Sequence, residues 1–293
     1  MGEDSHDYDR AVEQSFCVLE YTYKKEEKYM HSWDVLEKIE MILHLFKLSS
    51  VDCTGTVEKS SEINFTNHGT TQYGFYPKRG IVYYAKIKNN EIEYLKRFYR
   101  LMQKRLTRQM VNHYFERDEI EIAISRYSRG IEWVHHAESS VSYAVMTIEA
   151  LLIQSEGDQK LRFALKSSKL LSLIGLDMKQ VYENMMLAYD VRSKYVHGDK
   201  MSRKTSNSIK KKFKNEEKFA FTIMDYARLI IVVYIILNKS KNTLYKMLEN
   251  TQFGNGEGQF KKNLRPVFKY LKMTQYKPKF RHRAIHKIDY LTE

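Results

Sequence analysis

Hydrophobic residues recur three or four positions apart along most of the chain, and this helical spacing predicts a mainly α protein. The clearest stretch extends from about residue 118 to 238, where five amphipathic or apolar helices are expected to form a bundle. Only 3 prolines and 12 glycines occur in 293 residues, which leaves room for long helices. The apolar positions of the five helices lie within Ile120–Ile131, Val141–Leu152, Leu161–Leu173, Val181–Tyr189 and Phe219–Leu237.

Polar residues and glycines between these stretches predict where the helices begin and end. Ser139 and Ser140 precede the second helix and are expected to provide its N-cap. Gly175 follows the third helix and Gly198 the fourth, where a left-handed residue commonly terminates a helix. A basic loop is expected between Gly198 and the last, very apolar helix.

The first 115 residues have a mixed pattern. Helical spacing is found at Trp33–Phe46 and again at Ile92–Met102. Between these two stretches, Ile63–Thr66 and Ile81–Ile87 are typical of short strands separated by a turn. We therefore expect residues 1–115 to form a small α+β domain, whose role the pattern does not reveal.

The net charge of +13 is concentrated at one end of the chain. From Asp199 onward there are 22 Lys and Arg against 8 Asp and Glu, a net charge of +14. Such asymmetry indicates a polyanionic partner, either nucleic acid or an anionic membrane surface, and the alternative is a solubilising tail. Residues 239–293 are expected to be a basic C-terminal extension of helical pieces, broken at Gly254–Gly258.

Cysteine usage and the N-terminus favour a soluble cytoplasmic protein. Cys17 and Cys53 have no CxxC spacing, so they are typical of reduced thiols. The N-terminus is polar and acidic, unlike a signal peptide. The longest apolar run, Leu229–Leu237, is shorter than the roughly 20 residues of a membrane helix, and we expect no membrane partner.

Candidate chemistry lies at an Arg and a His separated by four residues. The chain contains three such pairs: Arg192 and His197, Arg108 and His113, and Arg281 and His286. Side chains five positions apart on a helix differ by about 140° in direction, so the first pair can meet on one phosphate only in two ways. Either the helix ends between them, for which Gly198 is the candidate, or a second chain contributes.

The sequence around the first pair resembles a known family. The run Tyr189–Gly198, with Asp before Arg-Ser and an apolar residue before His-Gly, resembles the signature of HEPN domains, specifically the ApeA-like branch. Upstream, Met146–Leu152 is similar to the Ile/Leu-Glu-Ala-Leu-Leu helix of that branch. The resemblance covers about residues 118 to 238. It implies a HEPN-type helical bundle, preceded by the α+β region and followed by the basic tail.

The resemblance also implies an activity. HEPN ribonucleases cut RNA without a metal or cofactor, using the 2′-hydroxyl as the internal nucleophile. His197 would be the general base or the general acid, because imidazole exchanges a proton near neutral pH. Arg192 would bind the scissile phosphate. Family members pair two such helices, so a homodimer would form a composite site, and the products would carry a 2′,3′-cyclic phosphate and a 5′-hydroxyl.

Other residues near this segment are candidates for supporting roles. Ser193 lies on the same helical face as His197. Asp190 is a candidate to orient a basic side chain and Glu149 to pair with Arg192, and for both a purely structural ion pair is the alternative. Four basic residues could guide the RNA backbone, or simply lie in a solvated loop: Lys194, Lys200, Arg203 and Lys204.

Two functions remain in competition. The first is an RNA endonuclease of the toxin or antiviral-defence kind, with a first region that senses a trigger or restrains the nuclease, and with a regulatory or antitoxin partner. The second is a non-catalytic HEPN module that binds RNA or scaffolds a partner protein. A DNA-binding function has little support, because no helix-turn-helix or zinc-finger pattern is present.

Overall fold

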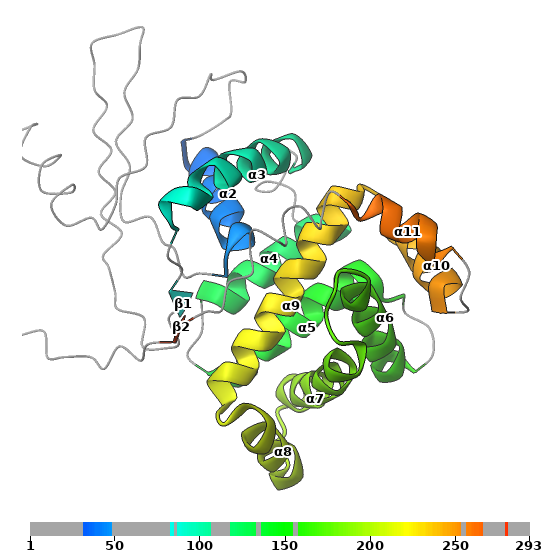
Figure 1. Cartoon of the computed structure of the whole chain (residues 1–293). Coiled ribbons are helices and arrows are strands. Elements are labelled where there is room, and N and C mark those ends of the chain that lie inside the picture. The colour runs from blue at the N-terminus through cyan, green and yellow to red at the C-terminus, as the bar shows by residue number, and fades with distance from the viewer. Residues whose placement is uncertain are drawn as a thin grey trace, which may run out of the picture. The chain divides into compact units, whose positions relative to one another are not determined.

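The computed structural model describes residues 32–48, 83–84, 87–106, 118–132, 136–154, 158–252, 256–265 and 279–280 (Figure 1). The chain divides into two compact units, one of residues 1–40 and 51–77 and the other of residues 41–50 and 78–293. In the first unit, the described residues are 32–40, the first part of helix α2 (Ser32–Phe46). The second unit contains the rest of α2 and all the other described elements.

The described residues form mainly α helices, which confirms the class predicted from the hydrophobic pattern. The five predicted bundle helices are present as α4 (Glu119–Glu132), α5 (Ala137–Leu152), α6 (Gln159–Leu173), α7 (Met178–His197) and α9 (Glu216–Leu237). The other described elements are β1 (Tyr83–Tyr84), the 3-10 turn η1 (Asn89–Glu91), α3 (Ile92–Arg105), α8 (Arg203–Phe213), α10 (Lys241–Gln252), α11 (Glu257–Asn263) and β2 (Lys279–Phe280).

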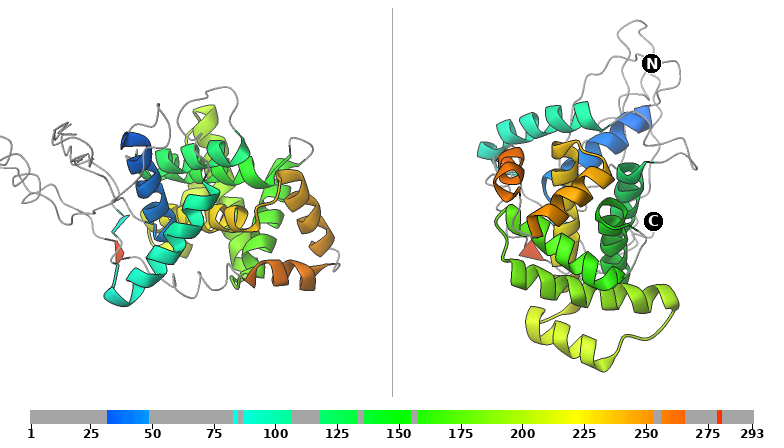
Figure 2. Two further views of the ribbon diagram at one scale, coloured as in Figure 1. Left: turned by 90° about the horizontal axis from the view of Figure 1, so that it is seen from above. Right: turned by 90° about the vertical axis from the view of Figure 1, so that its right-hand side faces the viewer.

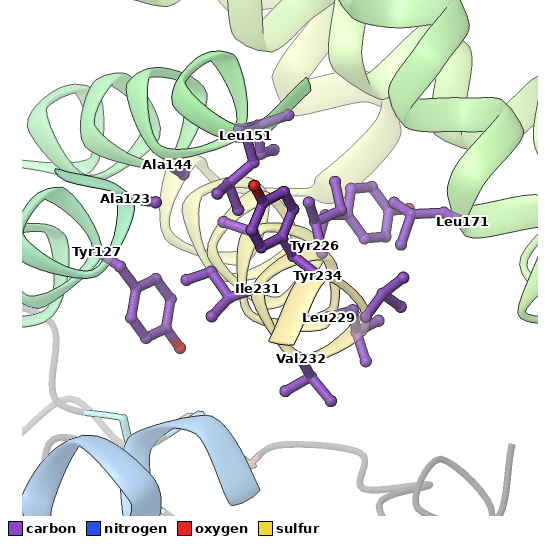
Figure 3. Packing of buried hydrophobic residues seen from close by; sticks show 14 of the residues in the cluster. Ala123, Tyr127, Ala144, Leu151, Leu171, Tyr226, Leu229, Ile231, Val232 and Tyr234 are labelled. Atoms are coloured by element: carbon purple, nitrogen blue, oxygen red, sulfur yellow. The ribbon is translucent and has the colours of Figure 1, made fainter. Parts of the chain in front are cut away.

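Helix α9 is the centre of the second unit. It packs against α4, α5, α6, α7 and α8, and the three views of the ribbon show these helices around it (Figures 1 and 2). Leu229, Ile231 and Val232 extend from α9 into the hydrophobic core, where Leu151 of α5 and Tyr127 of α4 lie beside them (Figure 3). Each fully buried side chain of this kind stabilises the fold by about 1.5–3 kcal/mol.

The apolar character of α9 corrects one expectation from the sequence. Helix α9 is long and apolar enough to cross a membrane by length and composition, although its continuous apolar run is short. Most of it is buried inside the bundle, and the core helix of a soluble protein satisfies the same criteria. The length of the continuous apolar run Leu229–Leu237 is therefore not enough to judge whether this helix could span a membrane.

A buried arginine joins α9 to the end of α2. The Nη1 atom of Arg228 donates hydrogen bonds to the carbonyl oxygens of Leu45, at 2.9 Å, and Phe46, at 3.2 Å. Its Nε donates to Asp225 at 2.7 Å. The last carbonyls of a helix have no partner within the helix, so Arg228 satisfies groups that burial would otherwise leave without a hydrogen bond.

The basic loop expected after Gly198 is largely a helix, α8, so that prediction was wrong. Ser202 caps its first turn and accepts a hydrogen bond from the backbone N–H of Thr205 at 3.1 Å. Ile209 is buried, and the ring centroid of Phe213 lies 5.0 Å from that of Phe219 in α9. Ile209 and Phe213, four residues apart on α8, hold this helix against the bundle. The surrounding lysines obscured their helical spacing in the sequence.

The predicted N-cap of α5 was also wrong. The helix begins at Ala137 and His136 is its N-cap. Ser139 and Ser140 lie inside the first turn, where Ser139 Oγ donates to the carbonyl of His136 at 2.7 Å. The buried Ser140 Oγ donates to the carbonyl of Gly130 in α4 at 2.9 Å. A contact with another helix, rather than local capping, therefore explains the serine at position 140.

Strand pairing differs from the expectation as well. Tyr83 and Tyr84, inside the predicted strand Ile81–Ile87, form β1, which pairs antiparallel with β2 of the C-terminal extension. The other predicted strand, Ile63–Thr66, lies outside the described residues. The extension is helical at α10 and α11, but Lys279–Phe280 is a strand. Of the predicted break Gly254–Gly258, Gly256 is the N-cap of α11 and Glu257 and Gly258 lie inside that helix, whereas residues 254 and 255 lie outside the described residues.

One hydrophobic cluster extends through the second unit. It includes Met41 of α2, Phe98 of α3 and Leu264 at the end of α11, besides the bundle helices. The segments before residue 118 and after residue 238 therefore share a core with the bundle in the part of the chain described. The domain boundaries inferred from the sequence remain predictions.

Candidate functional site

The last turns of α7 carry the Arg and His identified from the sequence. Helix α7 ends at Gly198, which has a φ of 71°. The backbone N–H of Asp199 donates to the carbonyl of Lys194 at 2.9 Å, and that of Gly198 to Tyr195 at 3.3 Å. These two bonds form a Schellman motif, which confirms Gly198 as the predicted terminator.

The position of this terminator has a geometric consequence. Helix α7 continues without a break through both Arg192 and His197, so it does not end between them. The two side chains therefore leave the helix about 140° apart. The first of the two ways of bringing them onto one phosphate is wrong, because the helix ends after His197 instead of before it. A contribution from a second chain stays a prediction.

Arg192 is held on the side of α7 that faces α5. Its Nη2 atom lies 3.1 Å from Oε2 of Glu149, which confirms the predicted contact between these two side chains. Its guanidinium carbon lies 5.7 Å from the ring centre of Tyr189, one turn earlier on α7. About a quarter of the Arg192 side chain is exposed, 23%, and its Nε atom is buried without a hydrogen-bond partner among the described residues.

Glu149 has further cations around it that the sequence analysis missed. Arg126 of α4 donates from Nη1 to the carbonyl of Met146 at 2.9 Å, and Lys241 of α10 donates from Nζ to the carbonyl of Glu149 at 3.4 Å. Burial raises the pKa of Glu149, while the charges of Arg192 and Arg126 oppose that shift. Three cations therefore gather at one half-buried carboxylate, which leaves a positive local charge.

No local signal in the sequence indicated Arg126 or Lys241. They come from helices separated from Arg192 by many residues, and the cluster exists only because α4, α5, α7 and α10 meet there. Burial lowers the pKa of Arg126, and the repulsion of Arg192 adds to this shift. The charge of Glu149 opposes the lowering of the Arg126 pKa, so the carboxylate offsets part of the charge of both arginines.

His197 is exposed on the last turn of α7. Ser193, half-buried one turn earlier, is on the same face of the helix. No ion pair or hydrogen bond joins Asp190 to His197 or Arg192. Asp190 pairs instead with Lys160 of α6, with 2.6 Å between Nζ and Oδ1. Asp190 thus orients a basic side chain, as predicted, but that side chain fastens α7 to α6.

The four basic residues proposed from the sequence to guide RNA are in different situations. Lys194 pairs with Asp199 at 2.9 Å, and the hydrogen bond and charge of Lys194 lower the pKa of Asp199. Lys200 is exposed just beyond the helix end. Arg203 and Lys204 are exposed on the first turn of α8. Lys194 is therefore partly neutralised, whereas the other three cations face solvent.

Two apolar side chains are exposed beside His197. Tyr195 has 43% of its surface exposed and Val196 49%, among the highest values for large hydrophobic residues in the described part of the chain. They lie on the last turn of α7, where the neighbouring helices no longer cover it. They offer apolar contact area beside His197, although single exposed hydrophobic residues are also common on protein surfaces.

The other two Arg and His pairs, Arg108 with His113 and Arg281 with His286, lie outside the described residues. Within the described residues, no group of three or more His, Cys, Asp or Glu side chains is arranged to hold a metal ion. The chain matches no protein-family model, no curated protein and no solved structure.

The positive φ of Gly198 predicts a measurable loss of stability on substitution. No atom lies within 4 Å of a Cβ added there, so Gly198→Ala would introduce backbone strain alone. We expect the free energy of unfolding to fall by about 1–2 kcal/mol. Chemical denaturation measures this change. Gly258→Ala in α11 is the control, because that site also has open space but ordinary backbone angles, and an equal loss in both variants would contradict the left-handed cap.

Proposed function

We propose that this protein is a metal-independent RNA endonuclease, with a HEPN-type helical bundle at residues 118–238, that acts as a homodimer. The activity would belong to a cytoplasmic toxin or antiviral-defence effector. The region before the bundle would then sense a trigger or restrain the nuclease, and a regulatory or antitoxin partner would control it.

The geometry of α7 is the observation that carries this proposal. An uninterrupted helix presents Arg192 toward α5 and His197 toward solvent, about 140° apart. The backbone of one chain therefore directs the two side chains to different sides of α7. Two copies related by a twofold axis can direct both side chains at one phosphate, since each contributes its His197 opposite the other's Arg192. The exposed Tyr195 and Val196 beside His197 provide apolar surface for that contact.

The proposed reaction is an internal transesterification. The 2′-oxygen of a ribose forms a bond to the adjacent phosphorus, and the bond from phosphorus to the 5′-oxygen of the next nucleotide breaks. His197 accepts the proton of the 2′-hydroxyl or donates a proton to the leaving 5′-oxygen. Arg192 binds the non-bridging oxygens, whose negative charge increases in the transition state. The products are a 2′,3′-cyclic phosphate and a 5′-hydroxyl.

Glu149 is proposed to position Arg192. A guanidinium carries five N–H donors in one plane, so a bond from Nη2 to Glu149 leaves others for a phosphate. A fixed fork of donors loses little conformational freedom on binding. The nearby Arg126 and Lys241 offset part of the negative charge that Glu149 would otherwise oppose to an incoming phosphate.

A non-catalytic role is the second candidate, and one observation favours it. Arg192 already has an ion-pair partner and is only 23% exposed, as expected of a residue that fastens α7 to α5. In that case the module would bind RNA or scaffold a partner protein, with His197 as one surface contact. Binding would then persist without any cleavage.

Cleavage of labelled RNA in EDTA separates these two functions. The purified protein is expected to cut the RNA in the chelator and to leave ends that carry a 2′,3′-cyclic phosphate, detected by their resistance to phosphatase until acid opens the ring. RNA that is bound but never cut would favour the non-catalytic module. Cleavage that requires a divalent metal would contradict the proposed mechanism.

A further inference from the structure

The outward face of α8 has an unusual concentration of positive charge. Arg203, Lys204, Lys210 and Lys211 are all exposed. On a helical projection Lys204 and Lys211 lie roughly opposite the buried Ile209, and Arg203 and Lys210 lie on the flank, about 100–120° from it. Arg203 and Lys210, and likewise Lys204 and Lys211, are seven residues apart, about 10 Å along the helix axis. We name these four residues the α8 cationic face.

Attachment of α8 to the bundle does not depend on this face. The opposite side is buried through Ile209 and Phe213, and Lys212 pairs with Glu183 of α7 at 2.6 Å. None of the four residues of the α8 cationic face forms an ion pair with another of the described residues. Their charges are therefore available to a partner in solution.

The placement of these charges opposes the stability of α8 itself. Arg203 and Lys204 lie in the first turn, which contains no acidic residue, although the partial positive charge of a helix N-terminus favours anions there. A bound polyanion would offset this unfavourable placement.

An open groove lies at the other end of α8, beside Phe213. Its volume is about 460 Å³, and it is lined by Lys212, Phe213, Lys214, Lys218, Phe221, Thr222 and Asp225. Phe221 is buried and the ring of Phe213 packs on Phe219, so the groove adds lysines near α8 rather than a stacking surface, and Asp225 offsets part of their charge. Lys214 has a φ of 73°, a left-handed conformation in which a glycine would be less strained.

We propose that the α8 cationic face binds the phosphate backbone of a single-stranded RNA outside the site at His197. This inference rests on the proposed ribonuclease function and adds to it a second contact with the substrate. Only six residues separate His197 from Arg203, at most about 20 Å of chain, so one strand can reach both. A membrane surface fits less well, because the outward face of α8 has no apolar residue to insert into lipid.

Salt-dependent binding of a labelled oligouridylate tests this surface. The test variant combines Arg203→Gln, Lys204→Gln, Lys210→Gln and Lys211→Gln. The control variant combines Lys239→Gln, Lys246→Gln, Lys262→Gln and Arg265→Gln, which are exposed residues of the same types and remove the same charge. Both carry His197→Ala as a common background, so that binding is measured without cleavage.

The slope of log K against log salt should become smaller by about 3 in the test variant, since each lost phosphate contact on a single strand contributes about 0.7. At about 0.1 M salt the affinity should fall on the order of 10²-fold. The control should keep the slope of its parent. An equal slope in the two variants would overturn the proposal. If the test variant does not fold, Arg203→Gln with Lys204→Gln and Lys210→Gln with Lys211→Gln are made as two separate double variants. Each double variant should show half of the decrease in slope.

A second arm separates this proposal from the function on which it rests. A dinucleotide such as UpU offers a single internucleotide phosphate, so the test substitutions, in a protein with His197 intact, should slow the cleavage of long RNA at low concentration by a larger factor than the cleavage of UpU. Failure of the unsubstituted protein to cut either RNA would contradict the ribonuclease and leave the binding slopes valid. Loss of binding to phosphatidylserine vesicles with an unchanged RNA slope would assign the face to a membrane instead.

Discussion

Substitution of His197 by alanine is expected to lower the rate of RNA cleavage by about 10²–10⁴-fold, the usual contribution of a general acid or base. The side chain is exposed on the last turn of α7, so its removal leaves no buried cavity and should not change stability. The initial rate of cleavage in EDTA measures the effect. An unchanged rate in a folded His197→Ala protein would remove the histidine from the mechanism.

Arg192→Ala should have an effect of similar size, about 10²–10³-fold, because it removes donors aimed at the developing negative charge. This variant also leaves the half-buried Glu149 without its 3.1 Å partner. Arg192→Lys is therefore the better test, since it keeps a positive charge beside Glu149 but loses the planar fork. A Lys variant with full activity would show that charge alone suffices. Lys179→Gln, which removes an exposed cation at the start of the same helix, is the control and should retain most of the activity.

The second large effect is expected from Val196→Arg. In a dimer formed around the last turns of α7, this substitution places two like charges close to the twofold axis, which costs several kcal/mol. We expect the dimer to dissociate at concentrations where the unsubstituted protein is dimeric, and cleavage to disappear in parallel. Sedimentation equilibrium and the cleavage assay, performed at the same concentrations, measure the two effects.

Met178→Arg is the matched control for this prediction. Met178 is also an exposed hydrophobic residue, 39% accessible, and it begins the same helix about 27 Å from Val196. Both variants add one positive charge to α7. Loss of the dimer in both, or in neither, would show that the surface beside His197 is not the contact between subunits.

Local sequence patterns were sufficient for much of this fold. The five bundle helices and the terminator Gly198 follow from apolar spacing and from the backbone freedom of glycine, both of which act within a few residues. The pair of Arg192 and Glu149 could also be predicted, because two sequence blocks resembled neighbouring helices of one family.

Features that depend on distant elements could not be predicted. Helix α8 was missed because only Ile209 and Phe213 mark its apolar side, among many cations. The cations Arg126 and Lys241 reach Glu149 only after four helices have packed. Likewise β1 pairs with a strand from the far end of the chain, which no local pattern indicates. The sequence shows that Gly198 follows His197. That Arg192 and His197 point about 140° apart became clear only from the unbroken helix α7.

The central claim is that Arg192 and His197 act on one phosphate from different subunits, and a mixed dimer tests it most directly. Arg192→Ala and His197→Ala proteins with different affinity tags are co-expressed, and the mixed dimer is isolated by two successive purifications. It retains one Arg192 and one His197, on opposite subunits. We expect it to cut RNA in EDTA at least about 10-fold faster than either parent homodimer. A mixed dimer no faster than its parents would contradict a composite site.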